Sequence, residues 1–92
     1  MNVEFTPIAW EDFNYWITFD KTKVEKINEL ICSIKQSPFK GIGSSELLRH
    51  ELQGFWSRRI HYEHRLVYRV VGAQEKDHKI LIIQCRYHYH HK

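Results

Sequence analysis

The chain has 92 residues, of which 42% are hydrophobic, and it contains five Phe, five Tyr and three Trp. A chain of this length has apolar surface for a single modest core, which excludes a second domain, and this composition excludes a disordered protein. The formal net charge is +3 and the isoelectric point is about 9.0, so the protein is mildly basic.

The positive charge is concentrated in the second half of the chain. Residues 1–46 contain five Lys and seven acidic residues, whereas residues 47–92 contain nine Lys plus Arg and four acidic residues, including all six Arg. A basic surface predicts a polyanionic partner, and nucleic acid is the first candidate. The Arg bias favours phosphate, because the guanidinium fork suits its geometry. The alternative is a solvated charged surface.

The first half of the chain predicts an edge strand followed by two amphipathic helices. Residues 1–5 form a short extended segment, and Thr6 and Pro7 are typical of an N-cap and a first helical residue. Apolar residues then recur at helical spacing to about Phe19, and Asp20 is a suitable N-cap for a second helix. The apolar positions of that second helix are Val24, Ile27, Leu30, Ile31 and Ile34.

The second half predicts a loop followed by strands. The segment QSPFKGIGSSE has the Pro, Gly and Ser content of a loop. The β-branched and aromatic residues that follow predict four strands, at about 47–52, 55–61, 64–71 and 79–86. Short connections favour antiparallel pairing. The predicted fold class is therefore α+β, with two N-terminal helices packed on one face of an antiparallel sheet of four or five strands, in one domain over residues 1–92.

Cysteine usage and hydropathy indicate a cytoplasmic location. Cys32 and Cys85 lie in apolar patterns without a CxxC motif, which predicts reduced core thiols. No apolar run in the sequence is long enough to span a bilayer, and the N-terminus lacks the charged segment and apolar core of a signal peptide. We therefore expect no membrane partner.

The stretch GFWSRRIHYEHRLVYRV, residues 54–70, places four Arg and two His within two predicted strands. Because side chains alternate between the faces of a strand, Arg58 and Arg59 lie on opposite faces. An odd number of residues in the connection around Tyr62 places Arg59 and Arg65 directly opposite each other. Their repulsion favours an anion between them. The alternative pairs each Arg with a nearby Glu in a surface salt bridge, and alternation alone favours neither.

Four motifs carry a resemblance to one known family. INELI (27–31), GFWSRRI (54–60), EHRLVY (63–68) and CRYHY (85–89) resemble, in their order and intervals, the YoeB (Txe/YoeB) branch of the RelE/ParE superfamily of bacterial toxins. The resemblance implies a RelE-like microbial RNase fold. It also implies a type II toxin that is a ribosome-dependent, metal-independent endoribonuclease, which cleaves messenger RNA in the A site by attack of the 2′-hydroxyl and inhibits translation.

The resemblance also implies roles for individual residues. The implied catalytic residues are the general base, the central phosphate-binding arginine, the general acid and the tyrosine that closes the motif: Glu46, Arg65, His88 and Tyr89, respectively. The implied RNA contacts are Arg59 and Arg49, the latter at a position where the family commonly has Lys. No cofactor is implied.

Taken singly, these residues have plainer explanations. Glu46 resembles a solvated acid, His88 a surface histidine at a strand end, and Tyr87 and Tyr89 edge packing. Their joint occurrence at the family's spacing favours the functional interpretation. Residues 88–92 form a C-terminal motif and short tail, which extends beyond the tyrosine at which most relatives end.

The partners implied by the resemblance are a YefM-type antitoxin, the ribosome and its messenger RNA. Dimerisation occurs among YoeB-like toxins, and no pattern in this sequence decides it.

Two alternative functions act by binding alone. One is a non-catalytic toxin of the same fold, such as the ParE-like toxins that act on DNA gyrase, but these lack the Glu, Arg and His set. The other is an RNA-binding module, with Trp56 as a stacking platform.

Overall fold

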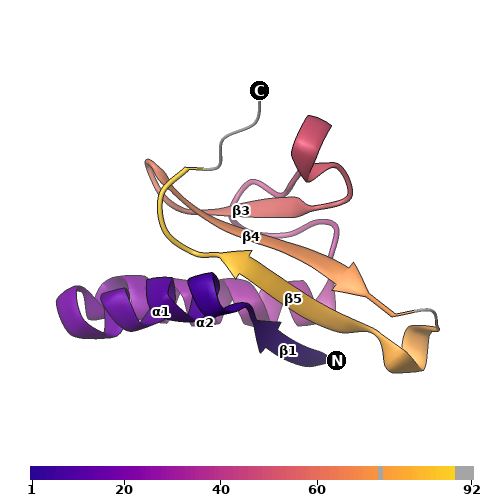
Figure 1. The fold of residues 1–92 in the computed structure, drawn as a ribbon, viewed down its shortest axis with the longest axis horizontal. Helices are drawn as coiled ribbons and strands as arrows, with labels where there is room; N and C mark the ends of the chain where they lie inside the picture. The colour runs from indigo at the N-terminus through magenta and orange to yellow at the C-terminus, as the bar shows by residue number, and fades with distance from the viewer. Residues whose placement is uncertain (73, 89–92) are drawn as a thin grey trace.

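The computed structural model describes residues 1–72 and 74–88, and within them two α-helices pack on one face of a five-stranded sheet (Figure 1). The elements in chain order are β1 (Asn2–Phe5), α1 (Pro7–Phe19), α2 (Lys21–Gln36), β2 (Glu46–Leu47), the 3₁₀ helix η1 (His50–Leu52), β3 (Trp56–His61), β4 (His64–Val71), the 3₁₀ helix η2 (Glu75–Asp77) and β5 (Lys79–Gln84). In these ranges no helix is long and apolar enough to cross a membrane.

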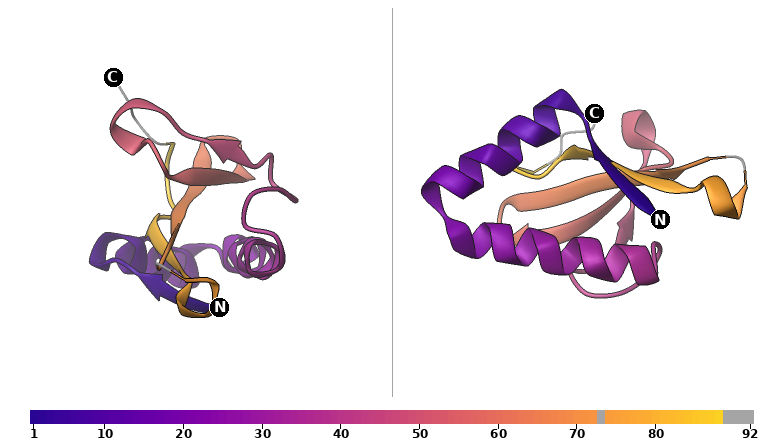
Figure 2. Two further views of the ribbon diagram at one scale, coloured as in Figure 1. Left: turned by 90° about the vertical axis from the view of Figure 1, so that its right-hand side faces the viewer. Right: turned by 90° about the horizontal axis from the view of Figure 1, so that it is seen from below.

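Both α-helices begin where the sequence predicts. Thr6 caps α1, because its Oγ1 accepts a hydrogen bond from Ala9 N at 3.2 Å. Asp20 ends α1 and caps α2: its backbone N–H donates to Trp16 O at 2.8 Å, and its Oδ1 accepts from Thr22 N at 3.1 Å. The joint between the helices is thus a single residue. Seen from below in Figure 2, α1 and α2 lie in front of the sheet and diverge from this joint.

The sheet is mixed, with the strand order β1-β5-β4-β3-β2. Strands β2 to β5 pair in antiparallel fashion, as predicted, and β1 is the predicted edge strand but runs parallel to β5. The prediction of a wholly antiparallel sheet is therefore wrong at this edge. No hairpin connects β1 to its neighbour, so the rule that short connections give antiparallel pairs does not apply to it.

The strand predicted at 47–52 is also wrong over most of its length. Only Glu46–Leu47 pair with β3, and His50–Leu52 form η1. His50 has a φ of 60° and Gly54 a φ of 91°, and such left-handed residues cannot continue an extended strand. The apolar residues of this segment, which suggested a strand, instead fold back onto the sheet.

Two hydrophobic clusters cover opposite faces of the sheet. The larger cluster lies between the helices and the sheet, and its buried members are Ala9, Trp16, Ile27, Leu30, Ile34, Ile60, Leu66, Tyr68, Ile80, Ile82 and Cys85. The smaller cluster lies on the other face, where Leu48 and Val67 are packed by Leu52, Phe55 and Ile83. Cys85 is a core thiol as predicted, but Cys32 is exposed, so its predicted core position is wrong.

Candidate functional site

The predicted arginine pair exists in the strand register. Arg59 and Arg65 are direct partners across β3 and β4, and the side chains of such partners have Cβ atoms about 4.5–5.5 Å apart. Arg58, one position earlier, is fully buried on the helix side, whereas Arg59 is exposed and Arg65 is half-buried. Neither Arg59 nor Arg65 is buried against the helices. A guanidinium buried there would have contradicted a shared anion site.

The guanidinium of Arg65 is oriented by the turn between β3 and β4. Its Nη1 donates to the carbonyl oxygens of His61, Tyr62 and His64 at 3.0, 2.7 and 3.1 Å. A guanidinium has five N–H donors, two of them on Nη1, so this tether engages one side of the group. The turn therefore fixes the plane of Arg65 at the edge of the site.

Glu46 lies one row further along the same face. It is paired with Ser57 across β2 and β3, and Ser57 precedes Arg59 by two residues, which corresponds to about 7 Å along a strand. Glu46, Ser57 and Arg59 therefore present side chains on the same side of the sheet. The Glu46 side chain is exposed. The structure thus brings the predicted base and the predicted arginine pair onto one face in neighbouring strands.

The segment that follows β5 brings the chain before His88 to the start of β4. The predicted strand 79–86 ends at Gln84, because the chain then leaves the regular ladder. Tyr87 O accepts a hydrogen bond from Arg65 N at 2.9 Å, and Tyr87 N donates to His64 Nδ1 at 2.8 Å. His88, the next residue, is exposed, and its peptide bond with Tyr87 carries the carbonyl that Arg65 binds. The sequence analysis grouped His88 with Glu46 and Arg65 on family resemblance and not on strand geometry.

Helix α1 holds the start of this C-terminal segment. Asp12 Oδ2 accepts a hydrogen bond from Cys85 N at 3.1 Å, and Trp16 Nε1 donates to Cys85 O at 2.8 Å. Burial raises the pKa of the Asp12 carboxyl, while the hydrogen bond from Cys85 and the charge of Arg86 act in the opposite direction. Both backbone groups of Cys85 are thus satisfied by α1 after the strand ends, which directs the chain toward β4.

Aromatic contacts complete the segment. The guanidinium carbon of Arg86 lies 3.4 Å from the centroid of the Tyr15 ring and 4.4 Å from that of the Tyr87 ring, so the cation is held between two aromatic faces. A hollow of about 450 Å³ opens beside it, lined by Ile8, Asp12, Ile83, Gln84, Arg86, Tyr87 and His88. The predicted acid therefore borders a space between α1 and the C-terminal segment.

Arg58 is a buried residue that supports the site and to which the sequence analysis assigned no role. Its guanidinium organises the loop that leads from α2 to Glu46. Its hydrogen-bond acceptors are Tyr68 Oη at 3.2 Å, Ser33 Oγ at 3.0 Å and the carbonyl oxygens of Ile42, Ser37 and Lys40 at 3.0, 2.8 and 3.2 Å. The signal was available in the alternation, because an arginine between two inward apolar residues indicates a buried polar network.

Two predicted residues remain, Arg49 and Tyr89. Arg49 is exposed in the connection between β2 and η1, and strand pairing does not extend to it. Tyr89 lies outside the described residues, so its predicted role stays a prediction. The strand register therefore places Glu46, Arg59 and Arg65 on one face of the sheet, and the backbone bond of Tyr87 brings the start of His88 to Arg65.

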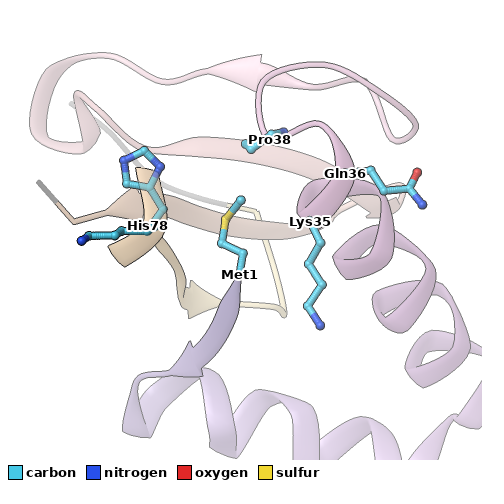
Figure 3. Close-up of a pocket in the computed structure, with 6 residues that line it drawn as sticks. Met1, Lys35, Gln36, Pro38 and His78 are labelled. Carbon is cyan, nitrogen blue, oxygen red and sulfur yellow. The ribbon is translucent and has the colours of Figure 1, made fainter. Parts of the chain in front are cut away.

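A larger hollow lies at the opposite ends of β4 and β5 from Arg65 and His88. It has a volume of about 540 Å³ and is lined by Met1, Lys35, Gln36, Pro38, Lys76 and His78. Figure 3 shows Met1 between His78 and Lys35, near the end of α2. None of the predicted site residues lines this hollow, so it is separate from the candidate site.

Comparison with known proteins assigns this chain to the toxins of bacterial type II toxin–antitoxin systems. The model of the family described as "YoeB-like toxin of bacterial type II toxin-antitoxin system" matches residues 5–89. The chain belongs to this family, and the resemblance carried by the four sequence motifs is thereby confirmed.

The relatives match the chain almost end to end. Toxin YoeB of Escherichia coli (strain K12) is 49% identical over 89 residues, which cover 97% of this chain and 100% of that protein. The structure of the YoeB/ParE toxin from Agrobacterium tumefaciens is 45% identical over 97% of this chain and 100% of that chain, with a TM-score of 0.91. The predicted fold class is thus confirmed.

Two Staphylococcus aureus structures show this fold in assemblies. One is a YoeB dimer, 47% identical with a TM-score of 0.85, and the other is a heterotetrameric YoeB–YefM toxin–antitoxin complex, 46% identical with a TM-score of 0.83. Each match covers 97% of this chain and 98% of the other chain.

Proposed function

We propose that this toxin is a ribosome-dependent endoribonuclease that cleaves messenger RNA in the A site and thereby inhibits translation. The observation that carries the proposal is the pair of contacts that Arg65 makes with its neighbouring segments. This residue is paired with Arg59 on one side, and on the other its backbone N–H binds the carbonyl oxygen of the residue before His88. In this proposal the two arginines bind the phosphate, His88 is the proton donor, and Glu46 is the base in the adjacent row.

The reaction in this proposal is an internal transfer at phosphorus. Glu46 accepts the proton of the ribose 2′-hydroxyl as the 2′-oxygen bonds to phosphorus. Arg59 and Arg65 donate hydrogen bonds to the non-bridging oxygens of the phosphorane. His88 gives its proton to the 5′-oxygen as the bond from phosphorus to that oxygen breaks. The products are a 2′,3′-cyclic phosphate and a 5′-hydroxyl.

The expected contributions follow from these roles. A general acid or base typically contributes about 10²–10⁴-fold in rate, and one well-placed oxyanion donor about 3–4 kcal/mol. The arginine pair is therefore expected to matter as much as either proton-transfer residue. We also assign to Tyr89 a catalytic contact and to Arg49 a contact with RNA outside the phosphate site.

The partners in this proposal are the ribosome, its messenger RNA and an antitoxin of the YefM type, in the cytoplasm. The supporting observations are the YoeB–YefM complex of the Staphylococcus aureus relative and the basic character of residues 47–92. An acidic segment that folds on binding complements this charge. The dimer of the same relative supports a homodimer.

The test is cleavage on ribosomes paused on a defined messenger RNA, with the new 5′ ends mapped. We expect cuts within the A-site codon for the wild-type protein and a loss of about 10²-fold or more for Glu46→Gln, Arg65→Ala and His88→Ala. Arg69→Ala is the matched control, because Arg69 is an exposed arginine of the same strand whose guanidinium lies over the Phe55 ring at 5.3 Å. It should cleave within about threefold of the wild-type rate.

Intact messenger RNA with folded, antitoxin-free wild-type protein would refute the enzymatic proposal. That outcome would favour a toxin or RNA-binding module that acts by binding alone. Cleavage retained in Glu46→Gln would instead refute the assignment of the base.

A further inference from the structure

The C-terminal segment is held to β4 through one strained residue. Tyr87 has a φ of 65°, a left-handed conformation that costs a residue with a side chain roughly 1–2 kcal/mol. Such a conformation persists only where its surroundings fix it. Tyr87 O accepts from Arg65 N at 2.9 Å and from Gln84 Nε2 at 3.1 Å, and Tyr87 N donates to His64 Nδ1 at 2.8 Å. His88 takes its direction from this residue.

The contact with His64 requires one protonation state. Nδ1 accepts a hydrogen bond only when it carries no proton, so the ring is a neutral imidazole with its proton on Nε2. The ring is packed edge-on against Trp16 of α1, at 4.8 Å between centroids and 84° between planes. If Nδ1 were protonated, two N–H donors would face each other at the position of the present bond. The Tyr87 backbone would then lose its only contact on the nitrogen side within the described residues.

We propose that neutral His64 is a positioning residue, which fixes the Tyr87 backbone and so holds His88 beside Arg65, and that protonation of His64 releases the C-terminal segment. The inference rests on the proposed function of His88 as general acid. It assigns His64 no contact with the substrate.

The charges around the ring favour its neutral form. Burial lowers the pKa of His64 below its usual value of 6.5, and Lys23 from α2, Arg86 from the C-terminal segment and His61 from β3 lower it further, while Glu63 acts in the opposite direction. Because the pKa of His64 is lower in the folded protein than in the unfolded chain, the tether contributes its full stability above about pH 6.5. It loses this stability as the pH falls through the folded pKa. The tether is thus intact at neutral pH.

This arrangement sets opposite requirements on two histidines. His88 must carry a proton to act as an acid, whereas His64 must lack one to hold His88 in place. Acidification therefore removes the support of the residue that delivers the proton. We expect the acidic limb of the pH profile to contain a contribution from His64.

The experiment compares His64→Asn with His64→Leu. Asn places an amide oxygen near the position of Nδ1 and cannot be protonated, while Leu is of similar size and has no acceptor. Hydrogen exchange of the Tyr87 amide is measured by NMR between about pH 5 and 8, corrected for the intrinsic exchange rate. We expect protection that is lost at acidic pH in the wild type, retained throughout in His64→Asn and absent throughout in His64→Leu. His61→Leu, which changes an exposed neighbouring histidine, should keep the loss of protection at acidic pH, displaced to higher pH because the charge of His61 no longer lowers the pKa of His64.

Cleavage on paused ribosomes provides the second measurement. His64→Leu should cleave about tenfold or more slowly at neutral pH, whereas His64→Asn should cleave near the wild-type rate with an acidic limb shifted to lower pH. Equal Tyr87 protection in the wild type and His64→Leu would overturn the tether, and full cleavage by His64→Leu despite lost protection would overturn the positioning role. The expected exchange pattern with no cleavage by any variant would instead count against the proposed function.

Discussion

Arg58→Met is expected to destabilise the protein strongly, although the substitution lies in a strand rich in exposed charge. The Arg58 side chain is fully buried and its guanidinium makes five hydrogen bonds, to α2, to β4 and to the loop between α2 and β2. Met fills much of the same space without any donor. The loop carbonyl oxygens and Ser33 Oγ then lose the group that holds them together.

The magnitude follows from opposing contributions. Hydrogen bonds to a charged group each contribute about 1.5–3 kcal/mol, and a buried acceptor left without a donor costs about 1–3 kcal/mol. Removal of the guanidinium also ends its desolvation penalty of several kcal/mol. Loop carbonyls that turn to water recover part of the loss. We expect a net decrease of about 3–5 kcal/mol in the free energy of unfolding, a large part of the roughly 5–15 kcal/mol of a typical domain.

Arg59→Met is the matched control, because Arg59 is the adjacent residue, carries the same side chain and is exposed on the opposite face. Its free energy of unfolding should stay within about 0.5 kcal/mol of the wild-type value, while its cleavage activity falls. Both variants are measured by urea unfolding with tryptophan fluorescence. A stability of Arg58→Met within about 1 kcal/mol of the wild type, at an unchanged m-value, would refute the argument from buried hydrogen bonds.

Two further predictions concern the core and the loop. Burial raises the pKa of the Cys85 thiol, and the charge of Asp12 adds to the shift. Iodoacetamide should therefore alkylate only the exposed Cys32 in the folded protein and both thiols in urea. Double alkylation of the folded protein, detected by mass spectrometry, would contradict this. A Cβ at Gly43, where φ is 84°, would lie 2.8 Å from Leu30 Cδ2, whereas one at Gly54, where φ is 91°, meets nothing within 4 Å. Gly43→Ala should therefore cost about 2–3 kcal/mol and Gly54→Ala about 1 kcal/mol in urea unfolding, and equal losses would show that backbone strain alone decides both.

Local patterns predicted much of the fold correctly. Thr6 and Asp20 cap the helices as their side chains indicated, because capping depends on groups within one helical turn. The alternation along β3 placed Arg58 and Arg59 on opposite faces, and the pairing of Arg59 with Arg65 expected for an odd-numbered connection is present, with a register shift between Arg59 and His61. These features could be predicted because strand alternation and hairpin register depend on residues close in sequence.

Local patterns were wrong for two segments whose residues suit more than one local structure. The segment 47–52 was predicted as a strand, but the left-handed φ of His50 and the burial of Leu48 turn it onto the far face of the sheet. The direction of β1 was equally open, because its partner β5 lies at the other end of the chain.

The sequence by itself thus determined the helix caps, the helices and the separation of Arg58 and Arg59 onto opposite faces of the sheet. Only the tertiary structure decided how His88 reaches Arg65, through bonds of Tyr87 to residues more than twenty positions away, such as His64 at a separation of 23. It also decided that Arg58 holds the loop before Glu46, through contacts that span up to 25 residues. Spacing along the chain predicts which residues share a face of a helix or strand. A hydrogen bond between distant segments forms only after tertiary packing has brought the two segments into contact.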